Sequence, residues 1–178
     1  DFGNALINAW LAREGRDKSQ FLAIDRLLYT GNRGMGALEY LPTNNPETPN
    51  SEPLLMAELV RMAQKVLDTR NGLELNDHEE SSLTQLLQIG TSAGGARAKA
   101  VVAVNKDRTE IRSGQVNSPD GFEHFLLKFD GIEEHKANSQ TFGDPKGYGV
   151  MEYVYHLMAK QAGINMSHCE LLKETNTQ

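Results

Sequence analysis

A glycine-rich segment at residues 90–99 is the first candidate for chemistry. It contains three glycines, one serine and two cations, and it leads into an apolar run at residues 100–105. Small residues allow successive backbone N–H groups to approach an anion, and Arg97 and Lys99 would add positive charge. The segment fits neither the Walker loop, which needs Lys-Ser/Thr after its second glycine, nor the dinucleotide fingerprint, which opens a helix. An anion-binding loop and an ordinary glycine-rich turn both remain open.

Two charged residues further along the chain could act with this segment. Lys128 lies within the apolar stretch 125–129, where an ammonium group is costly unless a counter-charge or ligand meets it. A lysine that reaches solvent from a sheet edge is the alternative. Glu152 lies in the first turn of a predicted helix, where the helix dipole by itself favours a carboxylate. It is on the flank of the helix face made by Met151, Val154, Tyr155 and Met158, from which it can reach the sheet.

These three features follow one another in a meaningful order. In a protein-kinase N-lobe, a glycine-rich loop, a strand lysine and a helix glutamate come in the same order and together hold a triphosphate. The sequence therefore favours a phosphate-binding arrangement built from residues 90–99, Lys128 and Glu152.

Helices are predicted to precede this arrangement. Apolar spacing indicates two short helices within residues 5–12 and 21–28, a third between the start signal 51–53 and the stop signal 71–72, and a fourth over 76–88. The buried face of the third helix is expected to carry Leu55, Leu59, Met62 and Val66. Four of the six prolines lie within residues 42–53, which reads as a linker or surface loop.

Strands are predicted to follow the glycine-rich segment. The runs 100–105, 110–116 and 122–129 are separated by turn signals, and a helix is expected over 150–162 with Gly163 just after its end. The apolar stretch 164–172 reads as a further strand. Helices, then strands, then a helix and a strand indicate an α+β fold with an antiparallel sheet.

Composition narrows the functional class. The 178 residues carry a formal net charge of −6, so binding of nucleic acid through a general positive field is not expected. The longest apolar run has five residues (100–104), far short of the roughly 20 that span a bilayer. Cys169 is the one cysteine, and the histidines lack zinc-ligand spacing. A soluble protein of a reducing, cytoplasmic compartment is the simplest reading.

The sequence resembles the HipA-type serine/threonine kinases, the toxin half of the bacterial HipA–HipB toxin–antitoxin pair. The matching stretches are Gly36 to Pro42 (GALEYLP), Thr91 to Lys99 (TSAGGARAK), His124 to Phe129 (HFLLKF), and Met151-Glu152-Tyr153 through Ala162-Gly163-Ile164 to Cys169-Glu170-Leu171. The resemblance implies a kinase-like N-lobe over residues 53–178, preceded by a helical segment (1–41) and a linker (42–52), and truncated before the C-lobe.

The resemblance also implies roles for individual residues. ATP with Mg²⁺ would be bound by Lys128 and by the loop residues Gly94, Gly95, Ala96, Arg97, Ala98 and Lys99. Lys128 and Glu152 would be the catalytic residues of this part of the kinase, and Ser92 would be the site of self-inactivating autophosphorylation. A translation protein such as an aminoacyl-tRNA synthetase would be the substrate. A HipB-like antitoxin would be the partner, with nucleic acid reached only through it and no membrane involved.

The sequence departs from the family in its catalytic segment. No aspartate is followed five positions later by asparagine, so the catalytic Asp and the Mg²⁺ ligands are expected outside this chain. We therefore expect a fragment that does not complete phosphoryl transfer by itself. The alternative is a non-catalytic interaction module that docks an antitoxin or another partner; an unrelated small α+β enzyme using Glu152 and a histidine is a third reading.

Overall fold

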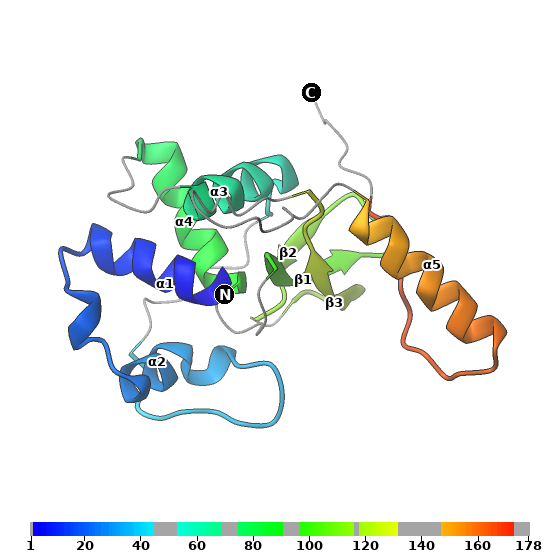
Figure 1. The fold of residues 1–178 in the computed structure, drawn as a ribbon, viewed down its shortest axis with the longest axis horizontal. Coiled ribbons are helices and arrows are strands. Elements are labelled where there is room, and N and C mark those ends of the chain that lie inside the picture. The colour runs from blue at the N-terminus through cyan, green and yellow to red at the C-terminus, as the bar shows by residue number, and fades with distance from the viewer. Residues whose placement is uncertain are drawn as a thin grey trace, which may run out of the picture.

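The structure is a computed structural model. It describes residues 2–44, 53–68, 75–90, 97–115, 118–131 and 147–172. Within these ranges the chain forms five α-helices and one three-stranded antiparallel sheet. The α+β class expected from the sequence is confirmed (Figure 1).

Three helices form the hydrophobic core: α1 (Phe2–Arg13), α3 (Met56–Asp68) and α4 (Asp77–Gly90). Their apolar residues recur three or four positions apart and therefore share one face of each helix. The side chains at the centre of the core are almost fully buried; they include Phe2, Leu6, Leu59, Leu83 and Leu86. Because α4 also packs on the sheet, the core runs without interruption from α1 to the first strand.

The helix predicted between residues 53 and 70 is present but begins later than expected. Leu59, Met62 and Val66 lie on its buried face. Leu55, expected on the same face, is 58% exposed because it precedes the first turn of α3. The fourth helix agrees closely with its prediction, since Asn76 and Glu79 cap its start reciprocally through side-chain and backbone hydrogen bonds of 3.0 and 3.1 Å.

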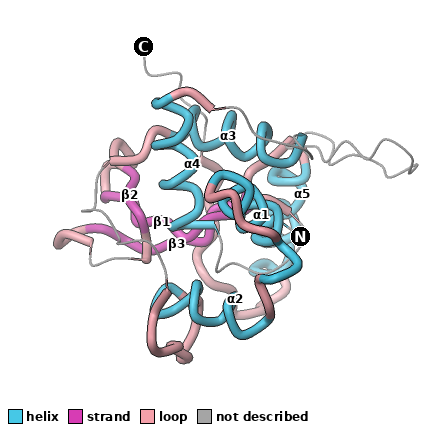
Figure 2. Tube along the Cα trace, turned by 90° about the vertical axis from the view of Figure 1, so that its left-hand side faces the viewer, coloured by secondary structure: helices cyan, strands magenta, loops and turns pink. Residues whose placement is uncertain are grey.

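The region after α1 is attached through an aromatic cluster. It contains η1 (Lys18–Gln20), α2 (Ala23–Thr30) and η2 (Gly31–Arg33), and α1 lies between this region and the α3–α4 pair (Figure 2). Tyr29 is fully buried, with its ring centroid 4.7 Å from that of Trp10. Burial raises the pKa of Tyr29, and it lowers the pKa of Arg33, whose guanidinium lies 4.9 Å from the centre of the Tyr29 ring.

The sheet has the strand order β2-β1-β3, with both pairings antiparallel. Its strands are β1 (Lys99–Asn105), β2 (Ile111–Ser113) and β3 (Phe122–Lys128). The strands expected at 100–105 and 122–129 are confirmed within one residue, and the second is shorter than the predicted 110–116. In the central strand β1, Val102 lies opposite Ser113 on one side and Phe125 on the other.

The helix predicted over 150–162 is α5 (Tyr148–Gln161), and Gly163 follows it with a φ of 82° as expected for a C-terminal glycine. Along the long axis of the molecule, the sheet lies between the other helices and α5 (Figure 1). The helix face made by Met151, Val154, Tyr155 and Met158 is exposed, at 46–64%. The inner face carries Glu152 and the buried His156.

The predicted strand at 164–172 is wrong. These residues have no regular secondary structure, although residues 167–172 lie beside β3 across a cavity. The segment is attached by its charged side chains: Glu170 pairs with Arg108 at 2.7 Å, and this contact requires no regular backbone pairing.

Candidate functional site

The centre of the candidate site is an ion pair between the sheet and α5. Lys128 is the last residue of β3, and its Nζ lies 2.5 Å from Oε2 of Glu152, near the start of α5. The two side chains are 47% and 42% exposed. The contact between Lys128 and Glu152 expected from the sequence is therefore present, and it lies where a ligand in solution can reach it.

An aspartate two residues beyond Lys128 fixes the start of α5. The backbone N–H of Gly147 donates to Oδ2 of Asp130 at 2.9 Å, and that of Gly149 donates to Oδ1 at 3.3 Å. The residue at the N-cap position, Gly147, has a φ of 110° and no side chain of its own to cap the helix. Asp130 takes that role from the neighbouring strand end, so the same short stretch of chain holds both Lys128 and the first turn of α5.

Arg97 reaches the same carboxylate from the other side. Its Nη1 lies 3.3 Å from Oε1 of Glu152, while Lys128 contacts Oε2. The Arg97 guanidinium also lies 4.1 Å from the centre of the Tyr148 ring, the first residue of α5. Each oxygen of Glu152 thus has its own cation.

The sheet register adds a further positive charge. Lys99 and Lys128 are directly opposite in the β1–β3 pair, so their side chains project from the same face of the sheet. Like charges at opposite positions disfavour strand pairing. The contact of Glu152 with Lys128 compensates part of this cost.

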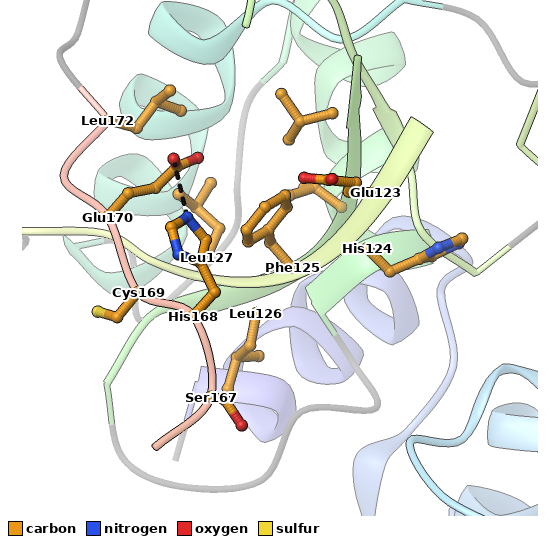
Figure 3. A pocket seen from close by; sticks show the side chains of 12 residues that line it. Glu123, His124, Phe125, Leu126, Leu127, Ser167, His168, Cys169, Glu170 and Leu172 are labelled. Carbon is orange, nitrogen blue, oxygen red and sulfur yellow. Dashed lines mark hydrogen bonds and ion pairs between the residues drawn. The ribbon is translucent and has the colours of Figure 1, made fainter. Parts of the chain in front are cut away.

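A cavity of about 700 Å³ lies along the same strand. Figure 3 shows Phe125 and Leu127 of β3 on one side and His168 and Glu170 on the other. Neither Lys128 nor Glu152 lines it, so the cavity is adjacent to the ion pair and distinct from it. Its walls combine apolar side chains of β1 and β3 with polar ones such as Glu123, His168 and Glu170, as in a site for a flat, partly apolar group.

Arg108 holds the outer wall of the cavity in place. It pairs with Glu170 at 2.7 Å and with Glu123 at 3.1 Å, and its guanidinium lies 4.9 Å from the centre of the Phe125 ring. Burial acts to lower the pKa of Arg108, but the hydrogen bonds with Glu123 and Glu170 outweigh it and raise the pKa above the usual value. His168 adds a contact of 3.3 Å to Glu170, drawn as a dashed line in Figure 3.

The structure brings together four of the residues singled out from the sequence: Arg97, Lys99, Lys128 and Glu152. A fifth, Ala98, has its side chain buried in the core, and its carbonyl accepts a hydrogen bond of 3.1 Å from the N–H of Phe129. The predictions for Ser92, Gly94, Gly95 and Ala96 lie outside the described residues.

Sequence reasoning missed two residues of the site, Asp130 and Tyr148. Asp130 is followed by glycine just after a strand, which reads as a plain turn. Its partner is the N-cap of α5, Gly147, which lies 17 residues later. Tyr148 lies just before the helix that was predicted to start at residue 150, so its contact with Arg97 was not foreseen.

Two other kinds of site are not found in the described part of the chain. No group of three or more His, Cys, Asp or Glu side chains there could hold a metal ion. None of the helices in the described ranges has the length and apolar character needed to cross a membrane.

The geometry defines a small α+β unit in which a strand lysine and a helix glutamate pair beside a cluster of cations. Residues 91–178, just under half of the chain, match the family model described as the HipA-like C-terminal domain. This match supports membership of the HipA family for that part of the chain, which contains every residue of the site. The comparisons with curated proteins and with solved structures gave no match.

Proposed function

We propose that this chain forms the nucleotide-binding part of a HipA-like serine/threonine kinase. Lys128 would bind phosphate oxygens of ATP, Glu152 would orient Lys128, and Arg97 and Lys99 would add positive charge around the phosphates. The loop residues Gly94, Gly95 and Ala96 would supply backbone N–H groups. The apolar cavity along β3 is the candidate site for the base of the nucleotide.

The observation that carries the proposal is the pair of Lys128 and Glu152 between the end of a strand and the start of a helix. In protein kinases this kind of pair must be in place for the lysine to act on the phosphates. The donor set also fits, because Arg97 and Lys128 both contact Glu152 and Lys99 lies directly opposite Lys128 in the sheet. The phosphate oxygens of ATP would accept hydrogen bonds from these cations.

The proposal extends to the larger protein of which this chain would be a part. Mg²⁺ would be held by the phosphates and by residues outside this sequence, together with the catalytic aspartate. The substrate would be a protein of translation such as an aminoacyl-tRNA synthetase, and a HipB-like antitoxin would be the regulatory partner. We therefore expect nucleotide binding, and no phosphoryl transfer, from the 178 residues alone.

Nucleotide binding tests this function directly. The unfolding temperature of the chain should rise with ATP concentration, since a ligand at 100 times its Kd stabilises the folded state by about 2.7 kcal/mol. Lys128→Met should remove most of this increase. Lys106→Met, at an exposed lysine in the turn after β1, is the matched control and should respond to ATP like the wild type. A wild-type chain that ATP at millimolar concentration does not stabilise would refute the proposal.

Self-inactivation at Ser92 belongs to the same proposal. A phosphate there would place nearly two negative charges beside the position proposed for the ATP phosphates, and repulsion would oppose binding. Mass spectrometry of the full-length kinase after incubation with ATP should find phosphate on Ser92. Phosphate found elsewhere with Ser92 unmodified would refute the switch.

A non-catalytic module that docks an antitoxin or another protein is the second candidate. The observation that favours it is the exposed apolar face of α5, where Tyr155 is 64% and Met158 is 56% accessible. Tyr155→Ser with Met158→Ser should then abolish binding of the antitoxin and leave any ATP response unchanged. The same double variant with unchanged antitoxin affinity would argue against this reading.

A further inference from the structure

The way in which α5 is attached to the rest of the molecule is unusual. Residues on its long apolar face are exposed; they are Val150, Met151, Val154, Tyr155, Leu157 and Met158, at 46–64%. Burial of apolar area therefore contributes little along that face. The polar contacts described above all fall on its start, between Gly147 and Glu152.

Arg97 makes two of these contacts at once. One guanidinium nitrogen pairs with Glu152 at 3.3 Å, and the planar group lies 4.1 Å from the centre of the Tyr148 ring. Tyr148 and Glu152 are four residues apart and so lie on neighbouring positions of the same helix face. Arg97, just before β1, therefore contacts α5 at two points. Two contacts fix the rotation of α5 about its axis as well as its distance from the sheet.

The geometry around Glu152 shows why the second cation matters. With Lys128 alone, the carboxylate could turn about its terminal torsion and keep its ion pair with either oxygen. Arg97 on Oε1 and Lys128 on Oε2 leave one orientation that satisfies both. The carboxylate is then preorganised, and so is the lysine that it contacts.

We propose that Arg97 is a positioning residue that holds the first turn of α5 against the sheet and thereby keeps Glu152 beside Lys128. That this positioning matters for nucleotide binding rests on the function proposed above. The attachment of α5 by Arg97 does not depend on that function. The guanidinium is suited to the role because it is planar. Its edge can donate to a carboxylate while its face stacks on an aromatic ring, and an ammonium group has no such face.

Hydrogen exchange of the 178-residue chain without nucleotide tests the attachment. Arg97→Gln should make the amides of residues 151–154 exchange about fivefold faster, because a partly exposed ion pair and a cation–π contact are lost together. Tyr148→Leu removes only the stacking and should give a smaller increase. Amides of α4 should not change in either variant, which shows that the chain is still folded.

The sheet offers a matched control in Arg112. It pairs with Glu110 at 2.5 Å and lies 5.5 Å from the centre of the Phe122 ring, so it has the same two kinds of contact away from α5. Arg112→Gln should leave exchange in α5 as in the wild type. Unchanged exchange at 151–154 in Arg97→Gln, or an equal increase in Arg112→Gln, would overturn the proposal.

Two further variants separate positioning from general stabilisation. If Arg97 acts partly through Glu152, then Arg97→Gln combined with Glu152→Gln should accelerate exchange by less than the two single effects added together, because their shared ion pair can be lost only once. Full additivity would overturn that role. Arg97→Lys should restore part of the protection, since it keeps the charge but not the stacking.

The outcome with ATP distinguishes this inference from the proposed function. If Arg97→Gln accelerates exchange in α5 as expected but the wild-type chain binds no ATP, the role of Arg97 is supported and the kinase function is refuted. A wild-type chain that binds ATP while Arg97→Gln leaves α5 unchanged supports the kinase function and refutes the role of Arg97.

Discussion

The ion pair of Lys128 and Glu152 should contribute little to stability, and this distinguishes a functional pair from a structural one. The perturbation is a double-mutant cycle with Lys128→Met, Glu152→Gln and the double variant. Both side chains are nearly half exposed, at 47% and 42%, so solvent screens their attraction. We expect a coupling free energy of about 0.2–1 kcal/mol, in the range of exposed pairs.

The magnitude translates into small changes in unfolding. For a chain of this length, about 1 kcal/mol corresponds to a shift of roughly 2–4 °C in Tm. Trp10 is the one tryptophan of the sequence and lies in the buried core, so its fluorescence in a urea titration reports unfolding of the whole core. Far-ultraviolet circular dichroism should give the same midpoint if the transition is two-state.

A large coupling would refute this reasoning. Breaking a buried pair costs about 3–5 kcal/mol, so a coupling of that size would mean that the pair is desolvated and structural. The expected pattern is the opposite: near-neutral stability combined with loss of the ATP response in the nucleotide titration. Such a result would mean that the pair of Lys128 and Glu152 acts in nucleotide binding and contributes little to the free energy of unfolding.

Three further predictions concern the scaffold. Gly114→Ala should destabilise the chain by about 1–3 kcal/mol, because a Cβ there would lie 2.8–2.9 Å from backbone atoms of Val102; an unchanged urea midpoint would contradict this close approach. Leu86→Ala should cost about 2–5 kcal/mol, since Leu86 is fully buried between helices, and a loss below 1 kcal/mol by urea titration would contradict its core position. The hydrogen bond from Lys65 lowers the pKa of Glu79 below 4.5. The ionised Glu79 therefore stabilises the folded chain fully at neutral pH, and this contribution is lost as the pH falls below 4.5. Glu79→Gln should remove that part of the acid sensitivity in Tm measured against pH.

Much of the fold could be predicted because local signals decide it. β1 is rich in valine and alanine, β3 is rich in phenylalanine and leucine, and turn residues flank both strands. α5 ends at a glycine whose positive φ is costly for other residues. The contact of Lys128 with Glu152 followed from their order along the chain and from the helical position of the glutamate. The roles of these residues in binding stay predictions.

The rest depends on contacts between distant parts of the chain. Helical periodicity identified which residues of α5 share a face, but it carries no information on whether that face is covered. The segment 164–172 has the composition of a strand, yet its attachment comes from Arg108, more than fifty residues earlier. Asp130 and Tyr148 contribute through partners that no sequence spacing identifies.

The ligand that we propose for this site is a compact anion. Arg97 and Lys128 both contact Glu152, Lys99 lies opposite Lys128, and Asp130 accepts hydrogen bonds from backbone N–H groups at the start of α5. These three cations lie in a chain with a net charge of −6. A long polyanion such as nucleic acid would feel the repulsion of the whole molecule, whereas a small polyphosphate would feel mainly the nearby cations because salt screens charges beyond roughly 10 Å. Because of the same screening, the proposed site would need its cations close to the phosphates, and Glu152 contacts two of these cations.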